Sequence, residues 1–464
     1  MNIVHFITHD TGRFLGCYGR PIGFSPNIDR FASESIRFNQ AFCSAPCCGP
    51  SRVCTMTGQY SHVNGSLGLG SMGWPIPLEK QTLVDHLNDA GYQTAHVGFC
   101  HERLYGEMRY EIDGKAGEDE SYWNCDARNV ADKAIEFFGT RDKSRPFYLN
   151  LATNETHAGH LTGSPKLRER HGDPVDPALS WVPPTEPDTP ETRARWANFY
   201  ASLQYVDHHF GRILEAIEAH GLRDDTLVVF TTDHGTGCQR GKRHVYQPGT
   251  EIALLVRPPK GCRTGYTVDH LIGNIDYFPT LLEAAGAADR IPGDVNGRSF
   301  WPLIAGQDYR PHGHIFVERN YHGEKMPDET EYADKYDPQR SIRTKDFVYI
   351  RHFRPQARPR PWYRGEIDTF NSDPKVGFEG GEPLPQENRE RPGVELYDLR
   401  HDPWEQLNVA GRGEYADIES RLAAELDQWM RETNDPAFDP GLPPPLMDPA
   451  HWPTRGSVIE LQRR

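Results

Sequence analysis

Short β-rich segments alternate with helical patterns along the first half of the chain, and this alternation limits the folds that the chain can adopt. The segments that we predict as strands are Asn2–Thr8, Thr94–Gly98, Phe147–Ala152, Thr226–Thr231 and Ile252–Val256. The segments that we predict as helices are Leu83–Ala90, Val130–Phe138 and Glu191–His220. Strands that alternate with helices are typical of an α/β fold, so we predict a large, mainly parallel sheet flanked by helices.

The character of the chain changes after about residue 340. We predict that Asp346–Arg351 and Glu395–Leu399 are strands of a second, antiparallel sheet, separated by a long stretch rich in proline, arginine and glycine. A helix is predicted over Ile418–Thr433, and a proline-rich tail follows it. We therefore predict a large α/β domain over residues 1–340 and a smaller C-terminal subdomain over residues 341–464.

The bulk composition argues against several classes of function. The formal net charge is -15, which disfavours general nucleic-acid binding. No apolar run reaches membrane-spanning length, and the N-terminal segment lacks the basic region and cleavage site of a signal peptide. The 9 cysteines are odd in number, which suits a reducing compartment better than a disulfide framework. We therefore expect a cytoplasmic protein that binds neither nucleic acid nor a membrane.

Four of the predicted strands run directly into polar residues. These residues are His9-Asp10, His101, Asn154–His157 and Asp233-His234. Ligands of open α/β sheets bind beyond the carboxyl ends of the strands, so we expect these side chains to gather at one edge of the sheet. Among them, His101 and His157 are candidates for proton transfer, because the histidine side chain suits that role.

Two adjacent pairs at these strand ends, His9 with Asp10 and Asp233 with His234, have the residue types that bind a divalent cation. An aspartate at a strand end can instead cap the next helix. Two such pairs at one predicted edge favour the metal site, so we predict one divalent metal held by these residues.

The most specific motif of the chain is Cys48-Gly49-Pro50-Ser51-Arg52, which is followed by Thr57-Gly58. Together with the strand-end pairs, it resembles the signature of type I sulfatases, a family of the alkaline phosphatase superfamily. The resemblance implies that a formylglycine-generating enzyme oxidises Cys48 to formylglycine, an aldehyde whose hydrate attacks sulfur. It also implies an alkaline phosphatase-like fold and a sulfuric ester or sulfamate hydrolase.

The same resemblance implies a role for each residue of the candidate site. Arg52 stabilises the nucleophile as an oxyanion, and Lys242 binds the sulfate. His157 protonates the leaving group, and His101 removes a proton from the second hydroxyl of the hydrate. The family metal is Ca²⁺, which is held by the two strand-end pairs and by the oxidised Cys48.

The chain departs from the family pattern at two positions. His9 stands where the family usually has aspartate, and Phe99 stands where it has a lysine that contacts sulfate and the leaving-group oxygen. Imidazole is a poor ligand for Ca²⁺. Ca²⁺ remains the expected metal, with His9 outside its coordination sphere. Mn²⁺ or Zn²⁺ are the alternatives, because His9 and His234 offer nitrogen ligands.

Segments far from the site resemble the heparan N-sulfatase (sulfamidase) members of the family in particular. They include Asn296–Ser299, Glu395–Asp398 and Glu432–Pro436. This resemblance implies a sulfated saccharide substrate, such as an N- or O-sulfated glucosamine. Because fold and family determine chemistry better than specificity, the sugar and its sulfated position stay open.

Residues 351–364 form the only strongly basic segment with interleaved aromatic residues in this acidic chain. Such a segment suits an anionic sugar chain that stacks on an aromatic ring, and a surface loop or subunit contact is the alternative. The candidate substrate-binding residues are Glu318, His322, Arg351, Arg354 and Trp362.

Two other functions stay open at this point. A phosphonate or phosphate ester hydrolase of the same superfamily is favoured by the histidines of the metal pairs, since transition metals serve phosphoryl transfer well. A catalytically silent protein that binds sulfated glycans is favoured by His9 and Phe99. The intact Cys48 motif, Lys242, His101 and His157 argue against the silent protein. Rates on sulfate and phosphonate monoesters would separate the two hydrolases.

Overall fold

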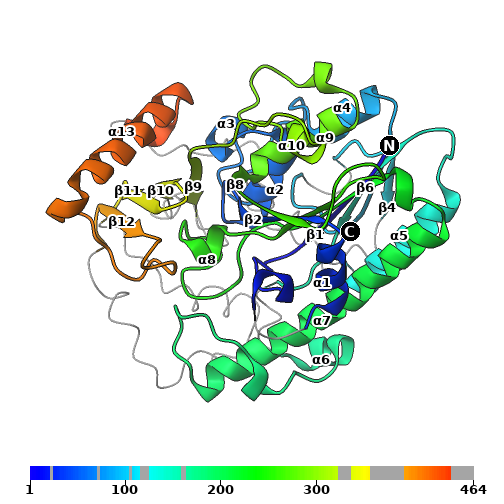
Figure 1. The fold of residues 1–464 in the computed structure, drawn as a ribbon, viewed down its shortest axis with the longest axis horizontal. Coiled ribbons are helices and arrows are strands. Elements are labelled where there is room, and N and C mark those ends of the chain that lie inside the picture. Colours follow the sequence, from blue (N-terminus) through cyan, green and yellow to red (C-terminus); the bar gives the residue numbers. More distant parts are fainter. Residues whose placement is uncertain are drawn as a thin grey trace, which may run out of the picture.

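The chain folds around two β-sheets. The computed structural model describes residues 1–20, 24–70, 74–103, 107–114, 125–157, 163–321, 336–355 and 391–439. Figure 1 shows a central sheet surrounded by helices and a smaller sheet at one end of the molecule, beside helix α13 (Ala416–Glu432). The predicted fold class is confirmed, whereas the division of the chain at residue 340 stays a prediction.

The central sheet has eight strands in the order β4-β3-β5-β1-β6-β7-β2-β8. Their bounds are β1 (Asn2–Thr8), β2 (Ile36–Phe42), β3 (Gln93–Gly98), β4 (Ile112–Gly114), β5 (Phe147–Ala152), β6 (Thr226–Thr232), β7 (Leu254–Arg257) and β8 (Tyr266–Gly273). All neighbouring pairs are parallel except the two that β7 makes with β6 and β2. The sheet is therefore mainly parallel, with one reversed strand in its interior.

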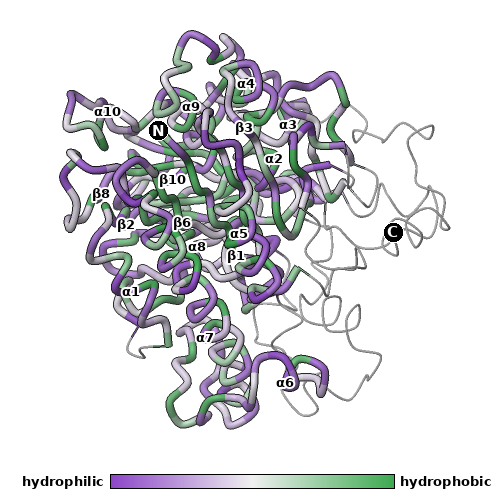
Figure 2. The backbone as a smooth tube through the Cα atoms, turned by 90° about the vertical axis from the view of Figure 1, so that its right-hand side faces the viewer, coloured by the Kyte–Doolittle hydropathy of each residue, from purple (hydrophilic) through white to green (hydrophobic). Residues whose placement is uncertain are grey.

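Helices cover both faces of the central sheet. Their bounds are α1 (Pro26–Ser33), α2 (Cys48–Thr57), α3 (Ser61–Asn64), α4 (Leu83–Asp89), α5 (Ala127–Thr140), α6 (Pro165–His171), α7 (Pro190–Ala219), α8 (Gln247–Thr250), α9 (Tyr277–Ala284) and α10 (Trp301–Ile304). Alternate residues of a strand point to opposite faces of its sheet. In β1, Val4 and Phe6 belong to the hydrophobic core on the side of α1, α5 and α7. Ile3 belongs to the core on the opposite side, with α4 and α9. Figure 2 shows hydrophobic stretches gathered around β1 and β6.

The second sheet is antiparallel, with the strand order β12-β11-β10-β9. Its strands are β9 (Ile315–Tyr321), β10 (Tyr336–Arg343), β11 (Phe347–His352) and β12 (Val394–Asp398). The apolar side chains Leu422, Leu426 and Met430 of α13 pack on this sheet in a shared buried cluster. The predicted helix and the two predicted strands of this region are present, with ends shifted by one or two residues.

Two further observations bear on the expectations from composition. All 9 cysteines are free thiols, so the described structure contains no disulfide. Among the described residues, no helix combines the length and the apolar character needed to cross a membrane.

Candidate active site

The carboxyl ends of four strands bring the predicted polar residues to one edge of the central sheet. Strands β1 and β6 are parallel neighbours, and their last pair is Thr8 with Thr232. On the other side of β1, strands β5 and β3 end in step, because Ala152 pairs with both Ile7 and Gly98. The residues that follow these strands therefore emerge side by side.

Two carboxylates and two imidazoles meet beyond β1 and β6. His9 Nδ1 lies 2.6 Å from Asp10 Oδ1 and 3.4 Å from Asp233 Oδ2. His234 Nε2 lies 3.1 Å from the same Oδ1 of Asp10. All four side chains are buried, and one donor atom from each lies within 4.8 Å of the others.

This group fits a divalent metal by the chemistry of its donors. The Nε2 atom of His9 is buried and makes no hydrogen bond within the described part of the chain, and that of His234 lies 3.1 Å from Asp10 Oδ1 without hydrogen-bond geometry. Burial opposes protonation, yet the carboxylates of Asp233 and Asp10 raise the pKa of His9 to about 9. A metal ion would compensate the two carboxylates and give the imidazole nitrogens a partner.

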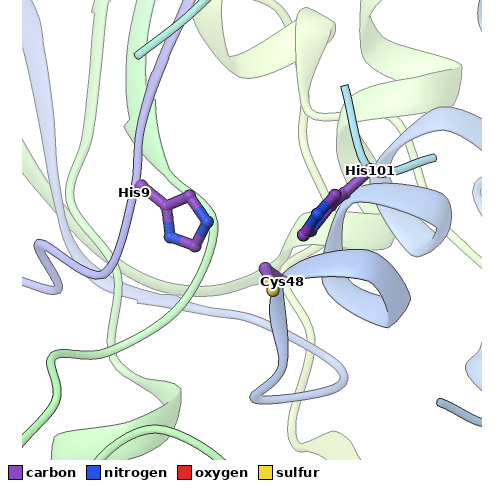
Figure 3. Close-up of side chains that lie close together, drawn as sticks. All are labelled: His9, Cys48 and His101. Carbon is purple, nitrogen blue, oxygen red and sulfur yellow. The ribbon is translucent and has the colours of Figure 1, made fainter. Parts of the chain in front are cut away.

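Cys48 is the first residue of helix α2, beside this donor group. Figure 3 shows the side chains of Cys48, His9 and His101 directed toward a common space, and their ligand atoms lie within 4.8 Å of one another. The hydrogen bond with Cys47 and the charges of Lys242 and His101 hold the pKa of the Cys48 thiol well below its usual range, although burial opposes this. Oxidation would turn the Cβ atom of Cys48 into the aldehyde carbon and place an oxygen where the sulfur now lies.

Arg52 follows Cys48 by one turn of α2, so both side chains lie on the same side of the helix. Its Nε donates to Asp233 Oδ2 at 3.1 Å, and its Cζ lies 5.1 Å from the centre of the Phe99 ring. Nη1 is buried and has no hydrogen-bond partner among the described residues. The guanidinium therefore keeps donor capacity for an anion beside Cys48.

Lys242 joins the metal group to His157. Its Nζ donates to Asp10 Oδ2 at 2.8 Å and lies 3.0 Å from His157 Nε2. Burial opposes ionisation of Asp10, but Lys242 and the neighbouring imidazoles hold the pKa of that carboxyl well below its usual range. Burial and the Lys242 charge lower the pKa of His157 as well, so His157 is a neutral acceptor for the ammonium.

Phe99 closes one side of the site with an aromatic ring. The ring is buried, and its centre lies 4.7 Å from that of His9 and 4.1 Å from that of His101. Phe99 stands where the resemblance predicts a lysine. Its ring packs against the two imidazoles and Arg52, so this position supplies no cation. Lys242 and Arg52 remain as the cations of the described site.

The candidate substrate-binding residues do not gather at one place, in contrast to the residues at the strand ends. Glu318 is fully buried in β9, where its carboxylate accepts hydrogen bonds from the backbone N and Nδ1 of His62. Arg351 forms an ion pair with Asp427 on α13, and Arg354 donates to the carbonyl of Tyr336. His322 and Trp362 lie outside the described residues. The substrate-binding role of these residues stays a prediction.

Sequence reasoning missed a cleft beside the nucleophile segment. It lies between α2, β9 and the loop after Lys242, and its lining includes Pro46, Cys47, Leu67, Arg243, Arg319 and Asn320. The available signal was the arginine that directly follows Lys242.

The fold and the site define a hydrolase of the alkaline phosphatase superfamily. The Sulfatase family model matches residues 1–287, and a model described as N-sulphoglucosamine sulphohydrolase, C-terminal, matches residues 237–362. Because the first match covers more than half of the chain, this chain belongs to the sulfatase family. Members of this family generally use a metal and formylglycine.

Similar proteins cover nearly the whole chain. N-sulphoglucosamine sulphohydrolase of Homo sapiens is 26% identical over 94% of this chain and 91% of its own length. N-acetylglucosamine-6-O-sulfatase of Bacteroides thetaiotaomicron is 25% identical over 94% of this chain and 87% of its own length. The crystal structure of the putative sulfatase yidJ from Bacteroides fragilis has a TM-score of 0.71 at 23% identity, covering 94% of this chain and 97% of that chain.

Proposed function

We propose that this protein is a formylglycine-dependent sulfatase that hydrolyses a sulfate ester or sulfamate of a saccharide, with glucosamine derivatives as the first substrates to test. The observation that carries the proposal is the position of Cys48 between Arg52, Lys242 and the buried donor group of two carboxylates and two imidazoles. The relatives named for glucosamine sulfates support the saccharide.

Oxidised Cys48 would supply a hydrated aldehyde as nucleophile, and a divalent metal held by His9, Asp10, Asp233 and His234 would supply a Lewis acid. The chain itself supplies two cations. Arg52 offers the free Nη1 of its guanidinium, and Lys242 offers an ammonium 2.8 Å from Asp10. Both would bind sulfuryl oxygens and neutralise the charge that develops on them.

Proton transfer falls to the two histidines on either side of the nucleophile. Lys242 Nζ and His157 Nε2 are joined by a hydrogen bond of 3.0 Å. A proton of the ammonium can therefore pass through this pair to the leaving group. His101 Nδ1 is buried without a hydrogen-bond partner among the described residues, which leaves it able to accept a proton beside Cys48. With Phe99 in place of a lysine, leaving-group protonation depends on the Lys242–His157 pair.

Replacing His157 with alanine should therefore lower kcat mainly for substrates with poor leaving groups. For an amine or alkyl leaving group we expect kcat to fall by about 10²–10³-fold, and for a nitrophenyl sulfate by less than about tenfold. Steady-state rates on both substrates measure the difference, with His208→Ala, an exposed position of α7, as the control. Equal losses on the two substrates would remove the proton-donor role.

We propose Mn²⁺ or Zn²⁺ as the metal in preference to Ca²⁺, because both imidazoles lie inside the donor group. We expect a chelator to lower kcat by about 10³-fold or more, and Mn²⁺ or Zn²⁺ to restore it better than Ca²⁺. Metal content by mass spectrometry, measured on the purified protein before and after chelation, accompanies the rates. Full recovery with Ca²⁺ alone would support the family metal and place the histidines in supporting roles.

The experiment that tests the function uses protein produced together with a formylglycine-generating enzyme, the maturation partner that the proposal requires. Sulfate release is measured from glucosamine N-sulfate, glucosamine 6-O-sulfate and a nitrophenyl sulfate. Turnover of either sugar supports the proposal and separates sulfamate from ester hydrolysis. Turnover of the nitrophenyl compound alone would contradict the saccharide substrate.

A phosphonate or phosphate ester hydrolase is the second candidate, favoured by the two histidines of the donor group. Nitrogen ligands suit the transition metals that serve phosphoryl transfer. Values of kcat/KM on matched nitrophenyl sulfate and phenylphosphonate esters decide between the candidates, because a sulfatase is expected to prefer the sulfate.

A further inference from the structure

The thiol of Cys48 belongs to a second group of metal-binding side chains, which shares His9 with the donor group beyond β1 and β6. The sulfur and one ring nitrogen each from His9 and His101 lie within 4.8 Å of one another (Figure 3). Cys48 and His9 are buried, whereas His101 is half-buried, so this Cys48 group borders solvent on the side of His101. A thiolate with two imidazoles suits zinc and other thiophilic metals, and it does not suit Ca²⁺.

The spacing of the three ligand atoms is within reach of zinc coordination. Bonds of about 2.0 Å to nitrogen and 2.3 Å to sulfur place tetrahedral ligand atoms roughly 3.4–3.6 Å apart. Because the three atoms already lie within 4.8 Å of one another, side-chain rotations that move each atom by less than about 1 Å complete the geometry. Three protein ligands leave the fourth position of the ion to water.

His9 is oriented for this role by its other ring nitrogen. Its Nδ1 lies 2.6 Å from Asp10 Oδ1, and an ionised carboxylate can only accept a hydrogen bond, so Nδ1 donates. The Nε2 atom is buried and has no hydrogen-bond partner among the described residues. A carboxylate commonly fixes a zinc-binding imidazole in this way and leaves the second nitrogen for the ion. An ion at Cys48 therefore uses Asp10 as a support for His9.

His101 and Cys48 complete the group. His101 Nδ1 is buried and makes no hydrogen bond within the part of the chain that the structure describes. Cys48 is the first residue of the 10-residue helix α2. The positive end of a helix dipole favours the thiolate, which is the form of cysteine that binds metals. Two imidazoles with unpartnered nitrogens beside this sulfur point to one cation bound by all three side chains.

Both departures of this chain from the sulfatase pattern favour the Cys48 group. His9, in place of the usual aspartate, supplies one of its imidazoles. Phe99, in place of the usual lysine, removes an ammonium that would repel a metal ion. The centre of its buried ring lies 4.7 Å from that of His9 and 4.1 Å from that of His101, so it forms an apolar wall that limits the access of water. One metal site thus accounts for two substitutions that sulfate hydrolysis does not require.

We propose that the unoxidised chain binds one Zn²⁺ ion through Cys48, His9 and His101, and that this site exists only until the thiol is oxidised. The proposal goes beyond the proposed function, because it concerns the chain before Cys48 becomes an aldehyde. Bonds to zinc replace the proton of the thiol and any proton on the two ligand nitrogens, and these protons leave to solvent. No electron is transferred. While zinc is bound, the sulfur is protected from electrophiles.

The test uses full-length protein produced without a formylglycine-generating enzyme, after intact-mass measurement has shown that Cys48 is a thiol. Zn²⁺ is titrated in competition with a chromophoric chelator, and Co²⁺ serves as a spectroscopic substitute. We expect about one equivalent of zinc and a thiolate-to-cobalt charge-transfer absorption in the near ultraviolet. Zinc should also slow alkylation of Cys48 by iodoacetamide at least about tenfold, measured by mass-spectrometric fragmentation of the peptide that spans residues 38–52.

Two variants separate the Cys48 group from the donor group beyond β1 and β6. Cys48→Ser and His101→Ala each remove a ligand that the donor group lacks, so each should lower the affinity for zinc at least about tenfold. Cys48→Ser should also abolish the charge-transfer absorption, as should oxidation of Cys48 in matured protein. Cys262→Ser, which removes a half-buried thiol between β7 and β8, is the matched control and should keep both properties. Thermal melting confirms that each variant folds.

The proposal is overturned if the thiol form binds no zinc, if cobalt gives no thiolate absorption, or if His101→Ala leaves the affinity and the absorption unchanged. Zinc bound without these signatures would belong to the donor group beyond β1 and β6 alone. The proposed function fails separately, when matured protein releases no sulfate from either sugar or from the nitrophenyl sulfate. The measurements on the thiol form hold in both cases, because they need no turnover.

Discussion

Replacing Cys48 with alanine is expected to lower kcat on a nitrophenyl sulfate by at least about 10⁴-fold in protein produced together with a formylglycine-generating enzyme. Cys48 is the candidate nucleophile of the described site, and its sulfur lies within 4.8 Å of ligand atoms of both His9 and His101. Without it, the proposed roles leave Arg52 and Lys242 to bind sulfate, but no group of the protein would attack sulfur, and residual catalysis would come from binding alone. Substrate affinity should therefore change far less than kcat.

The control for this substitution lies in the same helix. Cys54 is buried two turns further along α2, in the cluster that packs against the second sheet, and takes no part in the site. We expect Cys54→Ala to lower the free energy of unfolding by about 1–2 kcal/mol and to keep kcat within about twofold.

Mass spectrometry of the tryptic peptide that spans residues 38–52 decides whether the nucleophile exists. An aldehyde in place of the Cys48 thiol, together with the loss of activity in Cys48→Ala, supports the sulfatase. An active protein whose Cys48 is a thiol would contradict the mechanism. An inactive protein with an unmodified thiol, under conditions that mature a control sulfatase, would favour the glycan-binding alternative.

The second large effect concerns stability. Arg340 in β10 is fully buried and binds Asp435, which follows α13, through Nε and through Nη2 at 2.8 Å. It also donates to Asn320 Oδ1 and to the carbonyl of Arg319, both at 2.9 Å. Removing this guanidinium leaves the Asp435 carboxylate buried without its counter-charge. We expect Arg340→Met to lower the free energy of unfolding by about 3–5 kcal/mol, measured by urea denaturation.

Two matched variants separate the loss of charge from the loss of packing. Arg421 is exposed and pairs with Glu425 along α13, so Arg421→Met should cost less than about 0.5 kcal/mol. The double variant Arg340→Met with Asp435→Asn should recover part of the loss, because it removes both charges together. If Arg340→Met costs less than about 1 kcal/mol, the buried ion pair does not hold α13 to the second sheet.

The sequence predicted the parts of the fold that follow from local pattern. The apolar, β-branched runs ahead of His9 and Asp233 correspond to β1 and β6 because a strand buried on both faces needs a continuous apolar segment. Strand β2, over Ile36–Phe42, was not predicted, since its polar Arg37, Asn39 and Gln40 interrupt such a run. The reversed direction of β7 was not predicted either, because strand direction depends on the route of the connecting chain.

The sequence predicted which residues belong to the candidate site, but it did not predict which of them contact one another. The motif at Cys48 and the strand-end pairs appear as short local strings. The hydrogen bond between Lys242 and His157 joins residues 85 positions apart, and the Arg52–Asp233 contact joins residues 181 apart. These contacts exist only because β1, β5 and β6 are neighbours in the sheet.

The sequence by itself determined the sulfatase motif, the α/β class and the edge of the sheet at which the site lies, because each depends on residue types at short spacing. The tertiary structure alone decided that both imidazoles join the two carboxylates in one buried donor group, that Arg351 pairs with Asp427, and that Arg243 lines a cleft beside Cys47. Strand order and loop packing place these side chains, and neither is encoded in a local pattern.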